Sequence, residues 1–198
     1  MRELVLCLVS GGLVACASTS ATGRLPARLV DATGGAVPGR PVVLRSTDGV
    51  HFAETEVSVE MDSVPSAVRA LRGSGCPNRD GSVRYSRLEV DGADAYAVYV
   101  GEGPRFCAVT ARRSGMVVRV DEAIDPASLP AAAARTVEGI FHDDYTVTDA
   151  FKRTAGGSAT LEVHVRKSGQ EYVLVLAPSG TLQLRMRRYP AILDVPDR

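Results

Sequence analysis

A recurrence spaced by 65 residues is the feature that most restricts the folds open to this 198-residue chain. Val64-Pro65-Ser66-Ala67-Val68 corresponds to Leu129-Pro130-Ala131-Ala132-Ala133, and residues 96–100 correspond to residues 161–165. Ser114-Gly115 and Ser179-Gly180 keep the same spacing, although other segments slip by one residue. Two unrelated stretches of similar composition are the alternative. Agreement at several separated points favours an internal repeat.

Each half of the repeat has the pattern of one helix followed by strands. Pro65 and Pro130 suit the first turn of a helix, and they predict helices over 64–73 and 129–141. Apolar and polar residues alternate in the segments that follow, which is typical of strands. These strands are expected near 83–90, 95–100, 105–111 and 116–120, and again near 146–153, 160–166, 171–177 and 181–187.

The predicted fold class is α+β, with two tandem units that each pack one helix on a four-stranded antiparallel sheet. The units are expected to span 54–124 and 125–198, behind a short β segment at 24–53. In that segment a Gly/Pro-rich stretch separates two strand-like runs, which predicts a β-hairpin or a partial β module. Val30-Asp31-Ala32, Gly34, Val37-Pro38-Gly39, Val42 and Leu44 form a pattern that resembles the start of carboxypeptidase-regulatory-like β-sandwich modules, but too little chain follows to complete one.

The N-terminus carries a short apolar run that ends in Leu13-Val14-Ala15-Cys16. This pattern resembles a bacterial lipoprotein signal, in which residues 1–15 are removed and Cys16 becomes the lipid-bearing N-terminus. The run is too short for a transmembrane helix, which needs about 20 apolar residues. Residues 16–23 are mostly small or polar and suit a flexible tether. A buried N-terminal strand with a chance cysteine is the alternative.

The lipoprotein resemblance implies a protein of the bacterial cell envelope, anchored to the membrane by acyl chains such as palmitate on Cys16. Ala17 rather than aspartate follows this cysteine, which implies the outer membrane, facing the periplasm, in a Gram-negative cell. Cys7 leaves with the signal, so Cys76 and Cys107 remain as an even pair in an oxidising compartment. They are predicted to form a disulfide bond, with two buried free thiols as the alternative.

The order of elements, opened in the second half by Leu129-Pro130-Ala131-Ala132, resembles the PepSY-like family. These small bacterial envelope domains are related in shape to the β-lactamase inhibitor protein. The second unit matches better, through Phe141, Val147, Ala150, residues 161–165, Gly169, Glu171-Tyr172 and Ser179-Gly180. The first unit departs through its two cysteines and its irregular helix end. The resemblance implies binding or inhibition in the envelope and brings no catalytic residues.

Candidate chemical groups are few. His142-Asp143-Asp144 has the residue types of a metal site, but adjacent residues rarely converge on one ion, so a solvated loop is expected. His164 is out of phase with its apolar neighbours and is expected to be exposed. Arg185, Arg187 and Arg188 form a basic cluster that suits an acidic partner or phosphate groups. A solvated strand face is the simpler interpretation of that cluster.

The sequence contains no serine-hydrolase, zinc-peptidase or P-loop motif, and we predict no catalytic residue, metal or cofactor. Basic and acidic residues number 23 each, which argues against a nucleic-acid partner. We expect a membrane-anchored envelope lipoprotein that acts as a non-catalytic protein-binding or inhibitor-like module for an envelope protein. One alternative is an enzyme, or an immunity-type enzyme modulator, with a site between the two units. Another is a structural component of the envelope.

Overall fold

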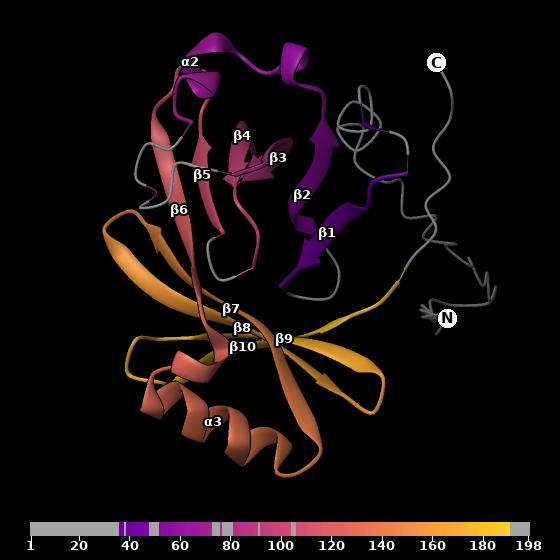
Figure 1. Ribbon diagram of the computed structural model, residues 1–198, viewed down its shortest axis with the longest axis vertical. Helices are drawn as coiled ribbons and strands as arrows, with labels where there is room; N and C mark the ends of the chain where they lie inside the picture. Colours follow the sequence, from indigo (N-terminus) through magenta and orange to yellow (C-terminus); the bar gives the residue numbers. More distant parts are fainter. Residues whose placement is uncertain are drawn as a thin grey trace, which may run out of the picture.

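The structure is a computed structural model that describes residues 36–37, 39–47, 52–72, 76, 81–90, 92–103 and 106–190. Its main feature is one ten-stranded antiparallel sheet whose strands neighbour one another in chain order. The sheet curls into a half-barrel (Figure 1). The strands are β1 (Val42–Ser46), β2 (Phe52–Val59), β3 (Val83–Val90), β4 (Ala93–Val100), β5 (Cys107–Ala111), β6 (Val117–Ile124), β7 (Tyr145–Ala155), β8 (Ser158–Lys167), β9 (Gln170–Leu176) and β10 (Leu182–Arg188).

Short helices lie before β3 and before β7. The first is α2 (Ser66–Arg69), preceded by the 3₁₀ turn η1 (Met61–Ser63), and the second is α3 (Ala131–Phe141), preceded by η3 (Pro126–Ser128). Figure 1 shows α3 lying against the part of the sheet formed by β7 to β10. Helices therefore make up a small part of the described chain.

The predicted fold class, with two separate helix-on-sheet units, is wrong. β6 pairs with β5 along one edge and with β7 along the other, so strands of both expected units belong to one sheet. β2 crosses the expected boundary between 53 and 54 and pairs in the same way with β1 and β3. A strand that is hydrogen-bonded along both edges leaves no break at which a second sheet can begin. The protein is mostly antiparallel sheet.

The first helix is shorter than predicted. α2 has four residues and ends at Arg69, whereas a helix over 64–73 was expected. The sequence after it is rich in glycine, and glycine is among the poorest helix-forming residues, so a longer helix is disfavoured there. The second helix falls within its expected range, and its buried side chains recur at i, i+4 and i+8: Ala133, Val137 and Phe141.

The 65-residue spacing recurs in the positions of the elements, although not in separate sheets. β2 begins at Phe52 and β6 at Val117, which are 65 residues apart. α2 begins at Ser66 and α3 at Ala131, again 65 residues apart. β6 is therefore the counterpart of β2 and also the strand that joins the two halves of the sheet.

A glycine in the turn before the last strand of each half lets the helix approach closely. At Gly180, where φ is +85°, a Cβ atom would lie 2.6 Å from the carbonyl carbon of Ala132. At Gly115, where φ is +88°, it would lie 3.2 Å from the carbonyl oxygen of Ala67. Both the positive φ and the close approach favour glycine. The hydroxyl of Thr136 also donates a 2.7 Å hydrogen bond to the Gly180 carbonyl, which holds α3 on this turn.

Two apolar cores hold the helices on the sheet. The core under α3 joins the helix to β8 and β9 and contains Ala133, Val137, Phe141, Leu161, Val163, Val165, Leu174 and Leu176. The core beside α2 joins the helix, and Val64 just before it, to β2 and β4. It contains Val57, Val59, Val64, Val68, Tyr96, Val98 and Val100. Burial of each valine, leucine or phenylalanine in these cores contributes about 1.5–3 kcal/mol, so the cores fix the helices in place.

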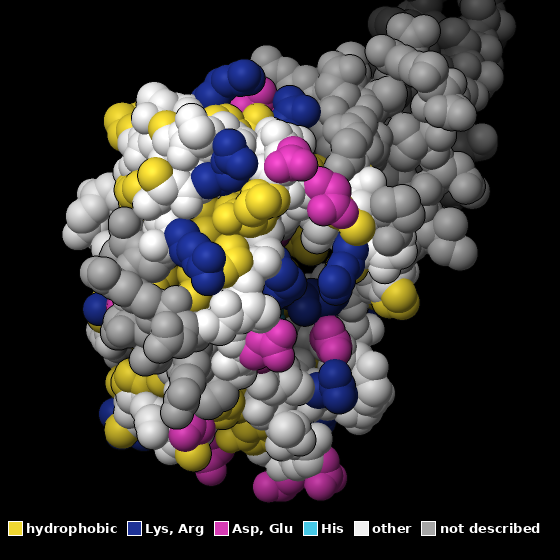
Figure 2. Space-filling view, turned by 45° about the horizontal axis from the view of Figure 1, so that its top comes forward, with side chains coloured by type: hydrophobic (Ala, Val, Ile, Leu, Met, Phe, Trp, Pro, Cys, Tyr) yellow, Lys and Arg dark blue, Asp and Glu magenta, His cyan; other side chains and the backbone are white. Residues whose placement is uncertain are grey.

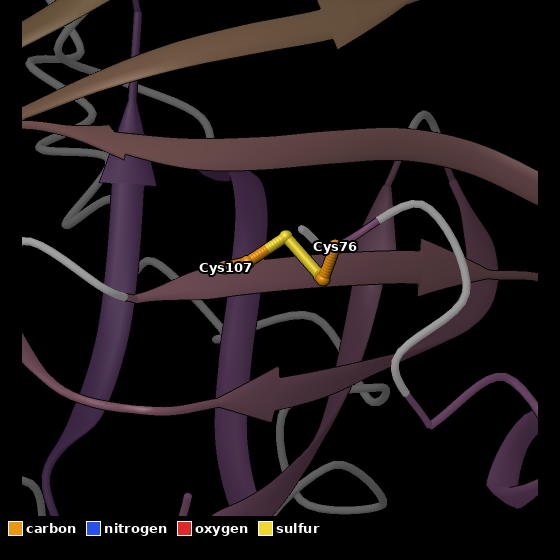
Figure 3. The surroundings of a disulfide bond; sticks show 2 residues. All are labelled: Cys76 and Cys107. Atoms are coloured by element: carbon orange, nitrogen blue, oxygen red, sulfur yellow. A yellow bond between two sulfur atoms is a disulfide. The ribbon is translucent and has the colours of Figure 1, made fainter. Parts of the chain in front are cut away.

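The predicted disulfide between Cys76 and Cys107 is confirmed (Figure 3). The two Cα atoms lie 5.7 Å apart, and the cysteines are separated by 31 residues in sequence. Both cysteines are buried and pack with Val109 of β5 in a small core of their own. The bond therefore ties the segment that follows α2 to the sheet at the start of β5.

Candidate functional site

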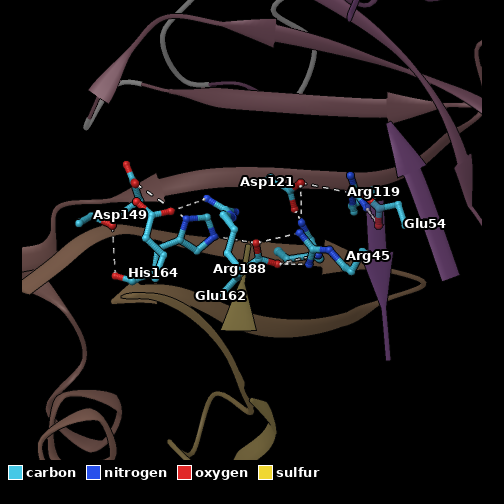
Figure 4. Close-up of polar contacts among 11 residues, drawn as sticks. Arg45, Glu54, Arg119, Asp121, Asp149, Glu162, His164 and Arg188 are labelled. Atoms are coloured by element: carbon cyan, nitrogen blue, oxygen red, sulfur yellow. Dashed lines mark hydrogen bonds and ion pairs between the residues drawn. The ribbon is translucent and has the colours of Figure 1, made fainter. Parts of the chain in front are cut away.

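The curl of the sheet gathers charged side chains from several strands on one face. We call this group the inner network. Figure 4 shows its side chains pointing toward one another between the strands. Its members are Arg45 of β1, Glu54 of β2, Arg119 and Asp121 of β6, Arg153 of β7, and Glu162 and His164 of β8.

Glu162 is the centre of the inner network, with only 4% of its side chain exposed. Arg45 donates hydrogen bonds of 2.7 and 3.2 Å to its two carboxylate oxygens. Arg153 Nη1 lies 2.9 Å from Glu162 Oε2, and His164 Nε2 lies 3.0 Å from Oε1. Because Arg45 and Glu162 are 117 residues apart, on β1 and β8, their ion pair connects distant parts of the curled sheet.

The inner network continues from Arg153 toward β2. Arg153 Nε donates a 2.8 Å hydrogen bond to Asp121, and Arg119 Nη1 donates a 3.0 Å hydrogen bond to Glu54. Arg119 Nε lies 3.1 Å from Asp121 Oδ2 as an ion pair but makes no hydrogen bond. Carboxylates and guanidinium groups thus alternate along the network. This alternation matters because buried charges are costly unless they are paired.

The pKa shifts follow from this pairing. Burial disfavours the charged form of Glu162, but hydrogen bonds from His164 and Arg45 and the charges of Arg45 and Arg153 outweigh it, so its pKa lies well below the ordinary value. Burial also disfavours charged Arg153, yet the hydrogen bond to Asp121 and nearby carboxylates raise its pKa. A general acid or base works best with a pKa near the working pH. These two groups are therefore suited to closing the sheet rather than to transferring protons.

A row of rings extends along the same part of the molecule. The ring centres are 5.7 Å apart between Tyr99 and Phe106, 5.4 Å between Phe106 and Phe151, and 5.4 Å between Phe151 and His164. The Tyr99 hydroxyl donates a hydrogen bond to Glu56. Burial and the adjacent Glu56 carboxylate raise the pKa of Tyr99 well above its ordinary value. The row links β4, β7 and β8 and ends at His164 in the inner network.

The expectation that His164 is exposed is wrong, since only 13% of its side chain is accessible. The expectation assumed a sheet with one solvated face, whereas the curl buries alternate residues of β8 on both faces. Leu161 and Val163 pack beneath α3, while Glu162 and His164 enter the inner network. Glu162 was not singled out from the sequence. Its signal was a carboxylate set among apolar residues in the middle of a strand.

The histidine and carboxylates after α3 lie in an exposed turn. Within the described ranges, no three His, Cys, Asp or Glu side chains come together to hold a metal ion. His142 and Asp144 have positive φ values of 57° and 59°, and His142, Asp143 and Asp144 are all exposed, so they form a solvated turn as expected. Across the described parts of the chain, no helix combines the length and apolar character needed to span a membrane. Cys16, the predicted signal at 1–15 and the tether at 16–23 lie outside these parts.

The basic cluster near the C-terminus lies on β10, the last strand of the sheet, which is paired with β9 alone in the described structure. The Arg185 guanidinium carbon lies 5.1 Å from the ring centre of Phe141 and 4.9 Å from that of Tyr172. Arg187 lies 5.6 Å from the ring centre of Tyr172 and 5.9 Å from that of Tyr189. We call these five alternating side chains the β10 ladder.

The β10 ladder is accessible and carries unbalanced charge. Tyr189 is 64% exposed, and both Arg185 and Arg187 are exposed. Among the described residues neither arginine has a carboxylate partner, whereas Arg188 lies 3.6 Å from Glu171. Stacking on rings holds a guanidinium plane in place while leaving donors at its edge for a carboxylate or phosphate. The β10 ladder is therefore able to bind an anionic group.

The face shown in Figure 2 does not separate positive from negative charge. Figure 2 shows a hollow on the face it views, with basic and acidic side chains close together around it. Nucleic-acid-binding proteins instead gather positive charge into a patch or stripe. The mixed charge on this face gives no support to a nucleic-acid partner.

Comparison with known proteins yields a likeness of fold. No protein-family model matches the sequence, and no curated protein matches it. The crystal structure of a DUF2874 family protein from Bacteroides ovatus ATCC 8483 is similar, with a TM-score of 0.50 and 17% sequence identity. The match covers 64% of this chain and 89% of that protein. At this identity the likeness concerns the fold alone.

Proposed function

We propose that this protein is a lipoprotein of the bacterial envelope whose folded part binds a protein partner without catalysing a reaction. The observation that carries the binding role is the β10 ladder, in which Arg185 and Arg187 are exposed, stacked and unmatched by carboxylates among the described residues. Unmatched, ordered arginines are typical of surfaces that meet an acidic group on another molecule.

The inner network supports a non-catalytic role. Its arginines and carboxylates are paired with one another, and the pKa of Glu162 lies far from neutral pH. An enzyme or immunity-type modulator with a site between two units was the main alternative. That alternative is weakened because the two halves form one continuous sheet. A structural envelope component stays open as an alternative, and it predicts no specific partner.

The envelope location rests on the sequence around Cys16, and the disulfide between Cys76 and Cys107 accords with it because such bonds persist in oxidising compartments. Lipid on Cys16 would hold the protein at the membrane through the tether at 16–23. With Ala17 after the cysteine, we propose the periplasmic side of the outer membrane. The short tether would present the folded part close to that membrane.

Two measurements test this proposal. The intact mass of protein extracted from membranes should equal the chain from Cys16 plus its acyl groups, and Cys16→Ser should abolish both the added mass and membrane retention. Mild crosslinking followed by affinity purification should recover a stoichiometric partner from the unaltered protein and not from the Arg185→Glu/Arg187→Glu variant. The proposal would be contradicted if the extracted chain carries no lipid, or if the same partner is recovered with the double-substituted variant.

A further inference from the structure

β10 offers two distinct faces to whatever lies beside it. Arg185 and Arg187 stand opposite Leu174 and Tyr172 on the face that carries α3. The residues between and before them point the other way: Leu184 stands opposite Val175, and Met186 opposite Val173. Along residues 184–187 the strand therefore alternates apolar and basic side chains, with Arg185 and Arg187 on one face and Leu184 and Met186 on the other. Arg188 shares the face of Met186, where it pairs with Glu171.

The outer edge of β10 also presents backbone groups. Because β10 ends the strand order, its outward N–H and C=O groups have no strand partner in the described structure. An extended peptide can add to such an edge, with main-chain hydrogen bonds giving affinity and alternate side chains giving specificity. The side chains of the added strand must then complement those of β10 on each face.

We infer that β10 accepts an extended acidic segment of a partner protein as an added strand. This inference rests on the proposed binding function. Carboxylates at every second residue of that segment would face Arg185 and Arg187, at a spacing of about 7 Å. The apolar residues between them would lie beside Leu184 and Met186. The stacked guanidinium groups are pre-ordered for charge-assisted hydrogen bonds, which are stronger than neutral ones.

A second copy of this chain is a poor occupant of the same edge. If two β10 strands paired antiparallel around Met186, Arg185 of each copy would lie opposite Arg187 of the other. Like charges directly opposite one another destabilise a strand pair. A membrane surface would satisfy the arginines but would leave the backbone edge without a strand. Charge and edge together therefore favour an acidic strand.

The test uses the full-length protein and a fluorescent peptide of alternating glutamate and valine, followed by fluorescence polarisation. We expect the peptide to bind, and a peptide of alternating lysine and valine not to bind. Arg185→Glu/Arg187→Glu should weaken binding by more than about tenfold, since it replaces two attractive contacts by repulsion. The matched control Arg72→Glu/Arg113→Glu makes the same charge change at exposed positions away from β10 and should have little effect.

Two further measurements separate strand addition from general attraction. Hydrogen exchange should show new protection of β10 amides when the peptide is present. Arg185→Lys/Arg187→Lys keeps the charge but loses the planar fork, so it should lose part of the affinity; its melting temperature should match that of the unaltered protein. Unchanged affinity in the lysine variant, or equal weakening by the control pair, would overturn the inference.

Other outcomes also decide the matter. Strand addition would be overturned if the β10 amides gain no protection when the peptide is present. It would also be overturned if the protein binds phosphatidylglycerol vesicles through Arg185 and Arg187 but does not bind the acidic peptide. A partner recovered from membranes through β10, together with no affinity for the acidic peptide, would refute this inference and leave the proposed function intact. Failure to recover any β10-dependent partner would instead count against the proposed function.

Discussion

Glu162→Gln is the substitution that most directly tests the role of the inner network. The change keeps the size and shape of the side chain but removes the negative charge that Arg45 and Arg153 approach to 2.7 and 2.9 Å. Only 4% of the Glu162 side chain is exposed, so water has little access to the guanidinium groups that lose their carboxylate partner. Removing one partner of a buried ion pair costs about 3–5 kcal/mol of folding free energy. For a chain of this size that corresponds to a melting temperature lower by about 10 °C.

The assay is urea unfolding followed by circular dichroism, with thermal melting as a second measure. Glu171→Gln is the matched control, because Glu171 also pairs with arginines, at 2.8 Å to Arg166, but its side chain is 37% exposed. Exposed pairs contribute only about 0–1 kcal/mol, so the control should change stability little.

A double-mutant cycle of Arg45→Met and Glu162→Gln isolates their interaction. The double variant should lose less stability than the sum of the losses in the two single variants, because each single change already removes the same ion pair. Equal losses for Glu162→Gln and Glu171→Gln, or strict additivity in the cycle, would refute the idea that this pair holds the curl together.

The folded state lowers the pKa of Glu162 below its ordinary value of 4.5, so the free energy of unfolding of the unaltered protein should fall as the pH drops below 4.5. Glu162→Gln should lose this part of the pH dependence, which urea titrations at several pH values measure. Cys76→Ser should lower the free energy of unfolding by about 3–4 kcal/mol in one cooperative transition, since the disulfide closes a 31-residue separation within one continuous sheet; two calorimetric transitions would contradict that continuity. Gly180→Ala should lower the free energy of unfolding by about 1–3 kcal/mol more than Gly169→Ala. Both glycines have positive φ, but only at Gly180 would the added Cβ meet Ala132, so equal melting temperatures of the two variants would contradict this contact.

The strands after each helix could be predicted because the sequence alternates apolar and polar residues there. The expected strand at 83–90 corresponds to β3, and the expected strand at 160–166 lies within β8. α3 was found because Pro130 marks its start. The disulfide follows from counting the cysteines that remain once the expected signal is removed. These features depend on neighbouring residues or on a small set of candidates.

The joining of the halves could not be read from such local patterns. β2 was missed although Glu54, Glu56 and Ser58 alternate with residues that include Val57 and Val59. The sequence pattern places its counterpart β6 at the end of a unit, whereas β6 pairs with β7. Which strand pairs with which depends on contacts between distant residues, and a repeat alone does not say whether its copies form one sheet or two.

The inner network was missed for a related reason. Glu162 and His164 alternate with core residues, and alternation normally places such residues in solvent. The curl brings Arg45 from β1 over this face, 117 residues away in sequence. The basic cluster on β10 was noticed from composition. Its stacking on Phe141 and Tyr172 required the packing of α3 against β9 and β10.

We propose that the outer edge of β10 meets a specific protein partner. The most direct measurement places a photo-activated crosslinking residue at Gln183 on β10 and, as the control, at Val43 on the opposite edge strand β1. In membranes of the native host, we expect one defined crosslinked species from β10, which is lost in the Arg185→Glu/Arg187→Glu background, and no such species from β1. Equal products from both edges, or a β10 product that survives the double substitution, would contradict it.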